Sequence, residues 1–137
     1  MNIKLINYGY KNKPKRYHYN DAGADVYSME KQVLRAHETI ALKLGFGLEL
    51  PDGYMAVIYP RSGHAKKGII SQMPPIDSGY KGEIHAIVTN TTNVDYIIEE
   101  NERVGQIVIY SIVLPTFNID ELEERGKGAF NSTGKWE

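Results

Sequence analysis

The stretch TIALKLGFGLELPDGYMAVIYP, from Thr39 to Pro60, sets the expectation for the fold. From Thr39 to Leu50, apolar and polar residues alternate, which is the period of a β-strand with one buried face. Pro-Asp-Gly at positions 51–53 suits a tight turn, because proline fixes φ and glycine also permits positive φ. A run rich in aromatic and β-branched residues follows the turn at 54–60. The stretch therefore predicts two extended segments joined by a turn.

The same pattern continues through most of the chain. Short apolar runs separated by turn residues recur at 84–90 (IHAIVTN), 95–100 (DYIIEE) and 105–114 (GQIVIYSIVL), with no internal repeat. This pattern predicts an all-β sandwich or barrel. The exceptions are a short helix expected in SGHAKKG, 62–68, and a turn in DELEER, 120–125. Apolar residues on both faces of QIVIYSIV, 106–113, fit either an ordinary sandwich core or a central contact in a homo-oligomer.

Composition indicates one globular domain. The chain has 137 residues, 42% hydrophobic and 24% charged, which is typical of a soluble domain with a real core. The net charge of -1 predicts no general attraction to nucleic acid, and the basic run KNKPKRYHY, 11–19, is more typical of a solvated loop. The absence of cysteine excludes disulfides, thiolate zinc sites and cysteine nucleophiles.

No membrane or export signal is evident in the sequence. The longest strongly apolar run, 107–114, is far shorter than the roughly 20 residues of a membrane helix. The first sixteen residues lack the apolar core of a signal peptide. We therefore expect a cytoplasmic protein with neither a membrane nor a nucleic-acid partner.

Five polar, glycine-bearing segments carry the candidate chemistry. They are AGADVYS (22–28), PRSG (60–63), IDSGYKGEI (76–84), ERVGQIV (102–108) and RGKGAFNSTG (125–134). Taken singly, each has a plain structural interpretation: Asp77 suits a turn, Arg61 a strand end at the surface, and the last segment a glycine-rich terminus. That last segment also lacks the order of a Walker phosphate loop and the helix that would follow it.

Together and in this order, the five segments resemble the motifs of trimeric dUTPases, which hydrolyse dUTP to dUMP and pyrophosphate. The resemblance runs from about residue 22 to residue 134. It implies an all-β, jelly-roll-like sandwich or barrel of the β-clip type. It also implies a homotrimer whose active sites are shared between subunits. The whole chain, 1–137, would then be one domain with a β core at 1–118 and a C-terminal arm at 119–137.

The resemblance also implies roles for individual residues. Asp77 would be the general base that activates the attacking water. The sugar and uracil would be bound by Asp77, Tyr80, Ile84 and Phe130, with the Tyr80 ring against the deoxyribose and Phe130 over the uracil. The phosphates would be bound by Arg61, Ser62, Gly63, Gln106, Arg125, Ser132 and Thr133. Asp25 would hold Mg²⁺ through water, while the substrate phosphates supply most of the ligands.

Several positions depart from the family pattern. Ala24, Val26 and Gly105 are expected to be minor packing changes, whereas Ala129 and Asn131 replace two glycines of the last segment and are expected to alter its closure. The connection from Ser62 to Asp77 is shorter than usual and contains Met-Pro-Pro at 73–75. The asparagine that reads the uracil edge in the family is missing there, so Ser71 and Gln72 are the candidates for that role.

Two other functions fit parts of the sequence. The first is a relative of the dCTP deaminases, which share the broad fold. The second is a catalytically weak module that senses nucleotides or binds a protein, which the altered last segment and the shortened connection suggest. The PRSG segment and the complete last segment favour the dUTP pyrophosphatase over the deaminase.

Overall fold

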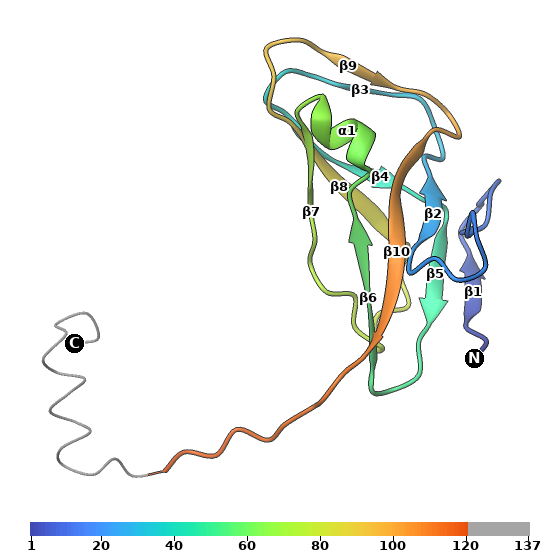
Figure 1. The fold of residues 1–137 in the computed structure, drawn as a ribbon, viewed down its shortest axis with the longest axis vertical. Helices are drawn as coiled ribbons and strands as arrows, with labels where there is room; N and C mark the ends of the chain where they lie inside the picture. The colour runs from blue at the N-terminus through green and yellow to red at the C-terminus, as the bar shows by residue number, and fades with distance from the viewer. Residues whose placement is uncertain (121–137) are drawn as a thin grey trace, which may run out of the picture.

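The structure, a computed structural model, describes residues 1–120 and is built almost entirely of antiparallel strands (Figure 1). Within this range the elements are β1 (Lys4–Asn7), β2 (Ala24–Tyr27), β3 (Gln32–Leu34), β4 (Thr39–Lys43), β5 (Phe46–Glu49), β6 (Tyr54–Tyr59), α1 (Ser62–Lys66), β7 (Ile69–Gln72), β8 (His85–Asn90), β9 (Tyr96–Ile98) and β10 (Arg103–Ser111). The prediction of an all-β fold is confirmed.

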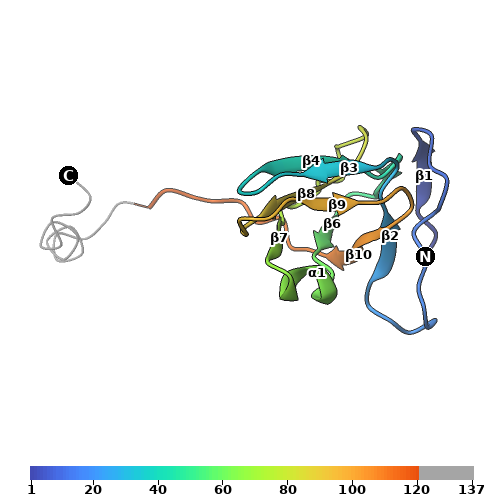
Figure 2. The same cartoon turned by 90° about the horizontal axis from the view of Figure 1, so that it is seen from above.

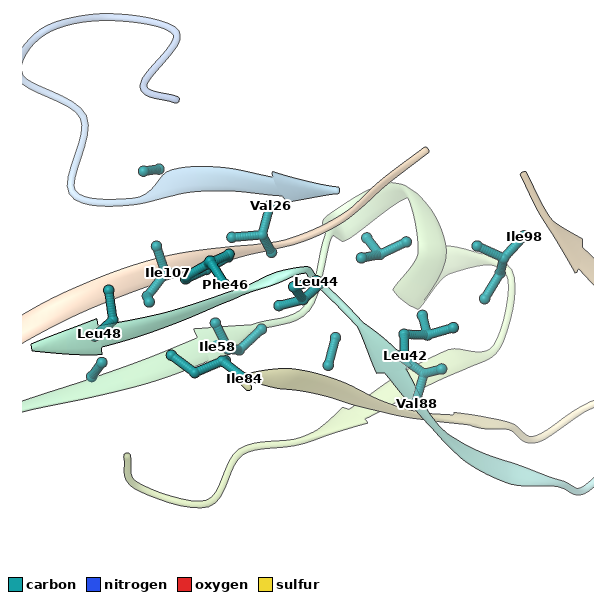
Figure 3. Close-up of a cluster of buried hydrophobic side chains, with 14 of the residues drawn as sticks. Val26, Leu42, Leu44, Phe46, Leu48, Ile58, Ile84, Val88, Ile98 and Ile107 are labelled. Carbon is teal, nitrogen blue, oxygen red and sulfur yellow. The ribbon is translucent and has the colours of Figure 1, made fainter. Parts of the chain in front are cut away.

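Two three-stranded sheets enclose the core. Their strand orders are β2-β10-β6 and β4-β8-β7, and two-stranded sheets, β1-β5 and β3-β9, complete the body (Figures 1 and 2). Most partners lie far apart in sequence, as in jelly-roll-like sandwiches, where long connections cross between sheets. One contiguous apolar cluster packs between the sheets (Figure 3), and its labelled members are Val26, Leu42, Leu44, Phe46, Leu48, Ile58, Ile84, Val88, Ile98 and Ile107.

The first of the two segments predicted at 39–60 is broken into two strands. Gly45, with φ of +84°, separates β4 from β5, and a Cβ at this position would lie 2.7 Å from the Tyr10 Cα. The chain bends there, so β4 pairs with β8 whereas β5 pairs with β1. Leu42, Leu44 and Phe46 nevertheless all point into the core, as the alternation predicts. Glycine is required at the bend because positive φ and the close backbone both disfavour a side chain.

Within one chain, only one face of β10 is fully covered. Val104 and Ile107 are buried and Ile109 packs against the same core, whereas on the other face Val108 is half-buried and Tyr110 is exposed. The residues after β10 run away from the body of the molecule as an extended segment (Figure 1). Several of its apolar side chains are exposed: Val113, Leu114, Phe117 and Ile119. Burial of both faces, which the sequence suggests, is therefore not achieved by the core of a single chain.

The predicted helix is present as α1, whereas all but the first residue of the turn predicted at 120–125 lies outside the described residues. Among residues 1–120, no helix has the length and apolar character needed to span a membrane.

Candidate active site

The loop between β7 and β8 borders a largely apolar pocket of about 270 Å³, which we call the hairpin pocket. Three of the predicted sugar and uracil residues, Asp77, Tyr80 and Ile84, lie on its wall. Its other lining residues are Ile58, Gln72, Met73, Pro74, Pro75, Ile76, Glu83, His85 and Ile87. An apolar pocket with a few polar groups on its wall is the usual form of a small-molecule site.

Main-chain hydrogen bonds fix both ends of this loop. The Ile76 N–H donates to the Ala56 carbonyl at 2.8 Å, and the Ala56 N–H donates to the Ile76 carbonyl at 3.0 Å. At the other end, the Ile84 N–H donates to the Phe46 carbonyl at 2.8 Å. Asp77 follows Ile76 directly and is exposed, so the main chain holds this residue on the pocket rim.

Tyr80 packs closely against its own loop. Its hydroxyl donates to the Glu83 carbonyl at 2.6 Å, and a Cβ at Gly82 would lie 2.7 Å from the Tyr80 Oη. Gly82 therefore makes room for the tyrosine side chain. Around Gly79 nothing in the described chain lies within 4 Å of an added Cβ.

The structure separates the two candidates for reading the uracil edge. Gln72 lines the hairpin pocket, whereas Ser71, the preceding residue of β7, does not. Glu83 and His85 also line the pocket, and the sequence analysis did not identify either. They alternate with Ile84, and this two-residue spacing in GEIHAI is the signal that could have placed them on one side of the strand.

A second pocket, of about 300 Å³, gathers most of the predicted phosphate residues, and we call it the phosphate pocket. Its lining residues are Asp25, Arg61, Ser62, Gly63, Arg103, Gly105 and Gln106, which come from three of the five sequence segments. Two guanidinium groups and one carboxylate give this pocket an excess of positive charge. Forked guanidinium donors suit the oxygens of a polyphosphate.

The position of β10 between β2 and β6 explains why distant residues meet in this pocket. Gln106 pairs with Asp25 of β2 on one side and with Tyr59 of β6 on the other. Arg103 and Gln106 would point to opposite faces of a regular strand, but a bulge between Arg103 and Gly105 shifts the register. Both residues consequently line the same pocket, and an Arg103 Nη1 lies 3.4 Å from an Asp25 carboxylate oxygen.

Gly105 is more constrained than the sequence suggests. A Cβ at this position would lie 2.6 Å from the carbonyl oxygen of Tyr59, a main-chain atom that cannot move aside. The expectation of a minor packing change therefore does not hold, because in this backbone a side chain at Gly105 would push β10 away from β6. At Gly63, by contrast, an added Cβ would make ordinary contact with the Arg61 guanidinium, 3.6 Å away.

The two pockets share no lining residue, and the hairpin pocket reaches Ile58 of β6, whereas the phosphate pocket begins at Arg61 beyond the strand. Asp77 follows Ile76, which pairs with Ala56 near the start of β6, whereas Arg61 comes just after the end of the strand. At about 3.3 Å per residue, this stretch of β6 separates the two groups by about 16 Å. The main-chain positions of Asp77 and Arg61 in one chain are therefore well separated.

Part of the predicted basic loop lies beside the phosphate pocket. Lys15 and Arg16 line a neighbouring pocket of about 290 Å³, whose wall also includes Asp25 and Arg103. Main-chain hydrogen bonds between Lys15 and Asp25 hold the loop there. The loop thus adds positive charge next to the phosphate pocket.

A partly buried polar cluster adjoins the segments that line the phosphate pocket. His64 of α1 is 3% exposed, and its Nε2 lies 2.6 Å from a carboxylate oxygen of Glu102. The Tyr96 hydroxyl donates to the same oxygen at 3.0 Å. Burial raises the pKa of Glu102, but hydrogen bonds from the Glu99 N–H, His64 and Tyr96 outweigh it and hold the pKa below its usual value. Burial, with the Glu102 carboxylate nearby, raises the pKa of the Tyr96 phenol.

Four predicted site residues, Arg125, Phe130, Ser132 and Thr133, lie outside the described residues, as do Ala129 and Asn131. Among residues 1–120, no group of three or more histidine, aspartate or glutamate side chains could hold a metal ion by itself. Asp25 is the only carboxylate among the described residues that line the phosphate pocket.

The chain is similar in sequence to known proteins of one family. The family model for dUTPase matches residues 10–134. A deoxyuridine 5'-triphosphate nucleotidohydrolase of Paramecium bursaria Chlorella virus 1 is 44% identical over 117 residues, covering 82% of this chain and 83% of the relative. The enzyme of the same name from Fusobacterium nucleatum is 38% identical over 143 aligned positions, covering 98% of each chain.

A solved structure gives the same result for the fold. A mutant of the dUTPase from phage phi11 of S. aureus, described with a structural Mg(II) ion, superposes with a TM-score of 0.83. The two chains are 24% identical, and the match covers 90% of this chain and 99% of the phage protein. The family match over most of the chain and the two close relatives show that this chain belongs to the dUTPase family.

Proposed function

We propose that this protein hydrolyses dUTP to dUMP and pyrophosphate. The observation that carries the proposal is the pairing of two different pockets in a chain of the dUTPase family. The hairpin pocket is largely apolar with the Asp77 carboxylate on its rim, and the phosphate pocket presents Arg61 and Arg103. The first suits a pyrimidine nucleoside and the second suits a polyphosphate.

In this reaction Asp77 acts as the general base. Its carboxylate accepts a proton from a water molecule as the water oxygen attacks the α-phosphorus. The bond from the α-phosphorus to the bridging oxygen breaks, and that oxygen leaves with pyrophosphate. Arg61, Ser62 and Gln106 hold the phosphate oxygens and stabilise the charge that develops on the leaving group. General-base assistance contributes about 10²- to 10⁴-fold to the rate.

Mg²⁺ fits the composition of the phosphate pocket. The single carboxylate there, Asp25, does not form a metal cage by itself, but Mg²⁺ commonly keeps its waters and takes further ligands from substrate phosphates. Asp25 would hold such an ion through water, and the bound ion would neutralise phosphate charge. The phage phi11 dUTPase mutant, which shares this fold, coordinates a structural Mg(II) ion.

We further propose a homotrimer in which one subunit supplies the hairpin pocket and a neighbour supplies the phosphate pocket of each site. The absence of any shared lining residue between the two pockets, among those described, supports this arrangement. So do the partly open face of β10 and the exposed apolar side chains beyond it, of which Phe117 is 88% and Ile119 is 100% exposed. Residues 1–118 would form the β core, and residues 119–137 an arm that closes over the bound nucleotide.

Selection of uracil would use the rigid rim of the hairpin pocket. Main-chain groups of the hairpin and the side chains of Gln72, Glu83 and His85 are available polar groups, and Met73, Pro74 and Pro75 line the pocket beside them. Thymine differs from uracil by one methyl group, and a difference in apolar contact alone would favour dUTP over dTTP by only about 1 to 3 kcal/mol. Stronger rejection of dTTP needs a steric wall that excludes this methyl group.

The direct test is pyrophosphate release from dUTP, dTTP, dCTP and UTP, each with Mg²⁺. We expect rapid release from dUTP alone. Comparable release from several nucleotides would reject uracil and deoxyribose selection by the hairpin pocket. Ammonia release from dCTP would identify a deaminase instead, and binding of dUTP without turnover would identify a nucleotide-sensing module.

Truncation before Arg125 tests the proposed arm. We expect the shortened chain to remain a trimer by light scattering and to lose roughly tenfold to a hundredfold in kcat/KM, since one charged hydrogen bond is worth about 1.5 to 3 kcal/mol. The alanine variant of Arg125 alone is the matched control, and should account for a large part of the loss. Full activity after truncation would reject a role for the arm.

A further inference from the structure

His64 is the one buried residue of α1, and the helix depends on it. α1 contains only five residues, has no side-chain cap at its start, and begins with Ser62 and Gly63 of the phosphate pocket. Helices this short are not stable on their own, so tertiary contacts must hold them in place. The position of Ser62 and Gly63 is therefore set by what His64 contacts.

His64 reaches across to the segment that leads into β10. Its ring nitrogen Nε2 lies 2.6 Å from Glu102, and because an ionised carboxylate only accepts, this nitrogen is the donor. The His64 ring also meets the Tyr96 ring edge-on, with centroids 5.6 Å apart. Both rings thus pack around the carboxylate of Glu102.

The carboxylate of Glu102 is held from three sides. His64 and Tyr96 donate to one oxygen, and the Glu99 N–H donates to the other at 3.0 Å. All buried side-chain nitrogen and oxygen atoms in the described part of the chain have hydrogen-bond partners. A fully satisfied polar network of this kind allows a single arrangement of the elements it joins.

Glu102 also fixes the other two walls of the phosphate pocket. Its main-chain carbonyl accepts from the Ser28 N–H at 2.9 Å, and Ser28 directly follows β2, the strand that carries Asp25. Its chain neighbour is Arg103, whose guanidinium contacts Asp25. The segments of Asp25, of Arg61 to Gly63 and of Arg103 to Gln106 therefore all meet at Glu102.

We propose that His64 and Glu102 are positioning residues that set the distance between the walls of the phosphate pocket. Neither lines that pocket, so they act through Ser62, Gly63 and Arg103 rather than by touching the nucleotide. This inference rests on the proposed function, because it assigns the phosphate pocket to the triphosphate of dUTP. Displacement of binding groups by about 1 Å costs on the order of 100-fold in activity.

The test measures binding of two nucleotides to His64→Leu. One is dUpNHpp, which resists hydrolysis and carries the whole triphosphate. The other is dUMP, which lacks the β- and γ-phosphates and relies mainly on the hairpin pocket. We expect the Kd of dUpNHpp to rise about tenfold to a hundredfold, while the Kd of dUMP changes less than about threefold. A merely destabilised protein would lose both ligands in proportion.

Two further variants distinguish a specific effect on the phosphate pocket from a general loss of folded protein. His64→Gln keeps a donor near the position of Nε2 and should restore most of the dUpNHpp affinity. Lys66→Ala changes an exposed side chain of the same helix and should leave both Kd values as in the natural protein. Melting temperatures of all variants show whether each is folded at the assay temperature.

The outcomes separate this inference from the proposed function. If the unaltered protein binds dUpNHpp and releases pyrophosphate from dUTP, yet His64→Leu binds dUpNHpp as tightly, the positioning role is overturned and the function stands. Equal losses for dUMP and dUpNHpp also overturn it. If the unaltered protein releases no pyrophosphate from dUTP, the proposed function fails, while selective loss of dUpNHpp binding in His64→Leu would still support positioning of the pocket.

Discussion

Replacing Asp77 with asparagine is expected to lower kcat/KM for dUTP by about 10²- to 10⁴-fold. The amide has the size of the carboxylate but cannot take a proton from water. Asp77 is exposed on the pocket rim, and its main-chain carbonyl accepts the Tyr80 N–H at 3.1 Å, a contact that asparagine keeps. The melting temperature and the Kd of dUpNHpp should therefore stay close to those of the unaltered protein, so the loss should appear in kcat.

Asp52→Asn is the matched control for this substitution. Asp52 is an exposed carboxylate in the turn between β5 and β6, and it accepts the Ser78 hydroxyl at 3.1 Å. An asparagine oxygen can accept the same bond, so activity should change less than about twofold. Loss of less than about tenfold in Asp77→Asn would contradict its role as the base and direct attention to Glu83, the other carboxylate on the wall of the hairpin pocket.

Local pattern was sufficient to predict strands but not their partners. Alternation at Leu42, Leu44 and Phe46 depends only on which face of a strand is buried, and all three are in the core. The break at Gly45 depends instead on Tyr10, which packs against it from a distant part of the chain. Pairings such as β2 with β10 likewise depend on the packing of the whole chain, which the alternation of apolar and polar residues along one strand does not reveal.

The same distinction applies to the site. Motif resemblance indicated Asp25, Arg61 and Gln106, which line one pocket. It did not indicate Arg103, because a regular strand would turn it away from Gln106, and only the bulge between Arg103 and Gly105 brings both to one side. The contact of His64 with Glu102 joins positions 38 residues apart, so no spacing in the sequence marks it.

Mixed trimers of two inactive variants are expected to recover activity. Asp77→Asn damages the hairpin pocket, and Arg61→Ala removes a phosphate donor, which should cost on the order of 100-fold. The two changes lie about 16 Å apart in one chain. If each site takes its hairpin pocket from one subunit and its phosphate pocket from another, some sites in a mixed trimer contain neither change.

An intact site takes its hairpin pocket from an Arg61→Ala chain and its phosphate pocket from an Asp77→Asn chain. When equal amounts of the two variants are refolded together, each of these conditions is met in half of the cases, so about one quarter of the sites should be intact. We therefore expect dUTP turnover to rise from about one hundredth to about one quarter of the unaltered level. Mixing Asp77→Asn with Tyr80→Ala is the control, because both changes lie in the hairpin pocket and every site keeps one of them. Light scattering and tagged subunits verify that mixed trimers have formed. Mixed trimers that show only the activity of the separate variants would mean that each chain builds its site alone.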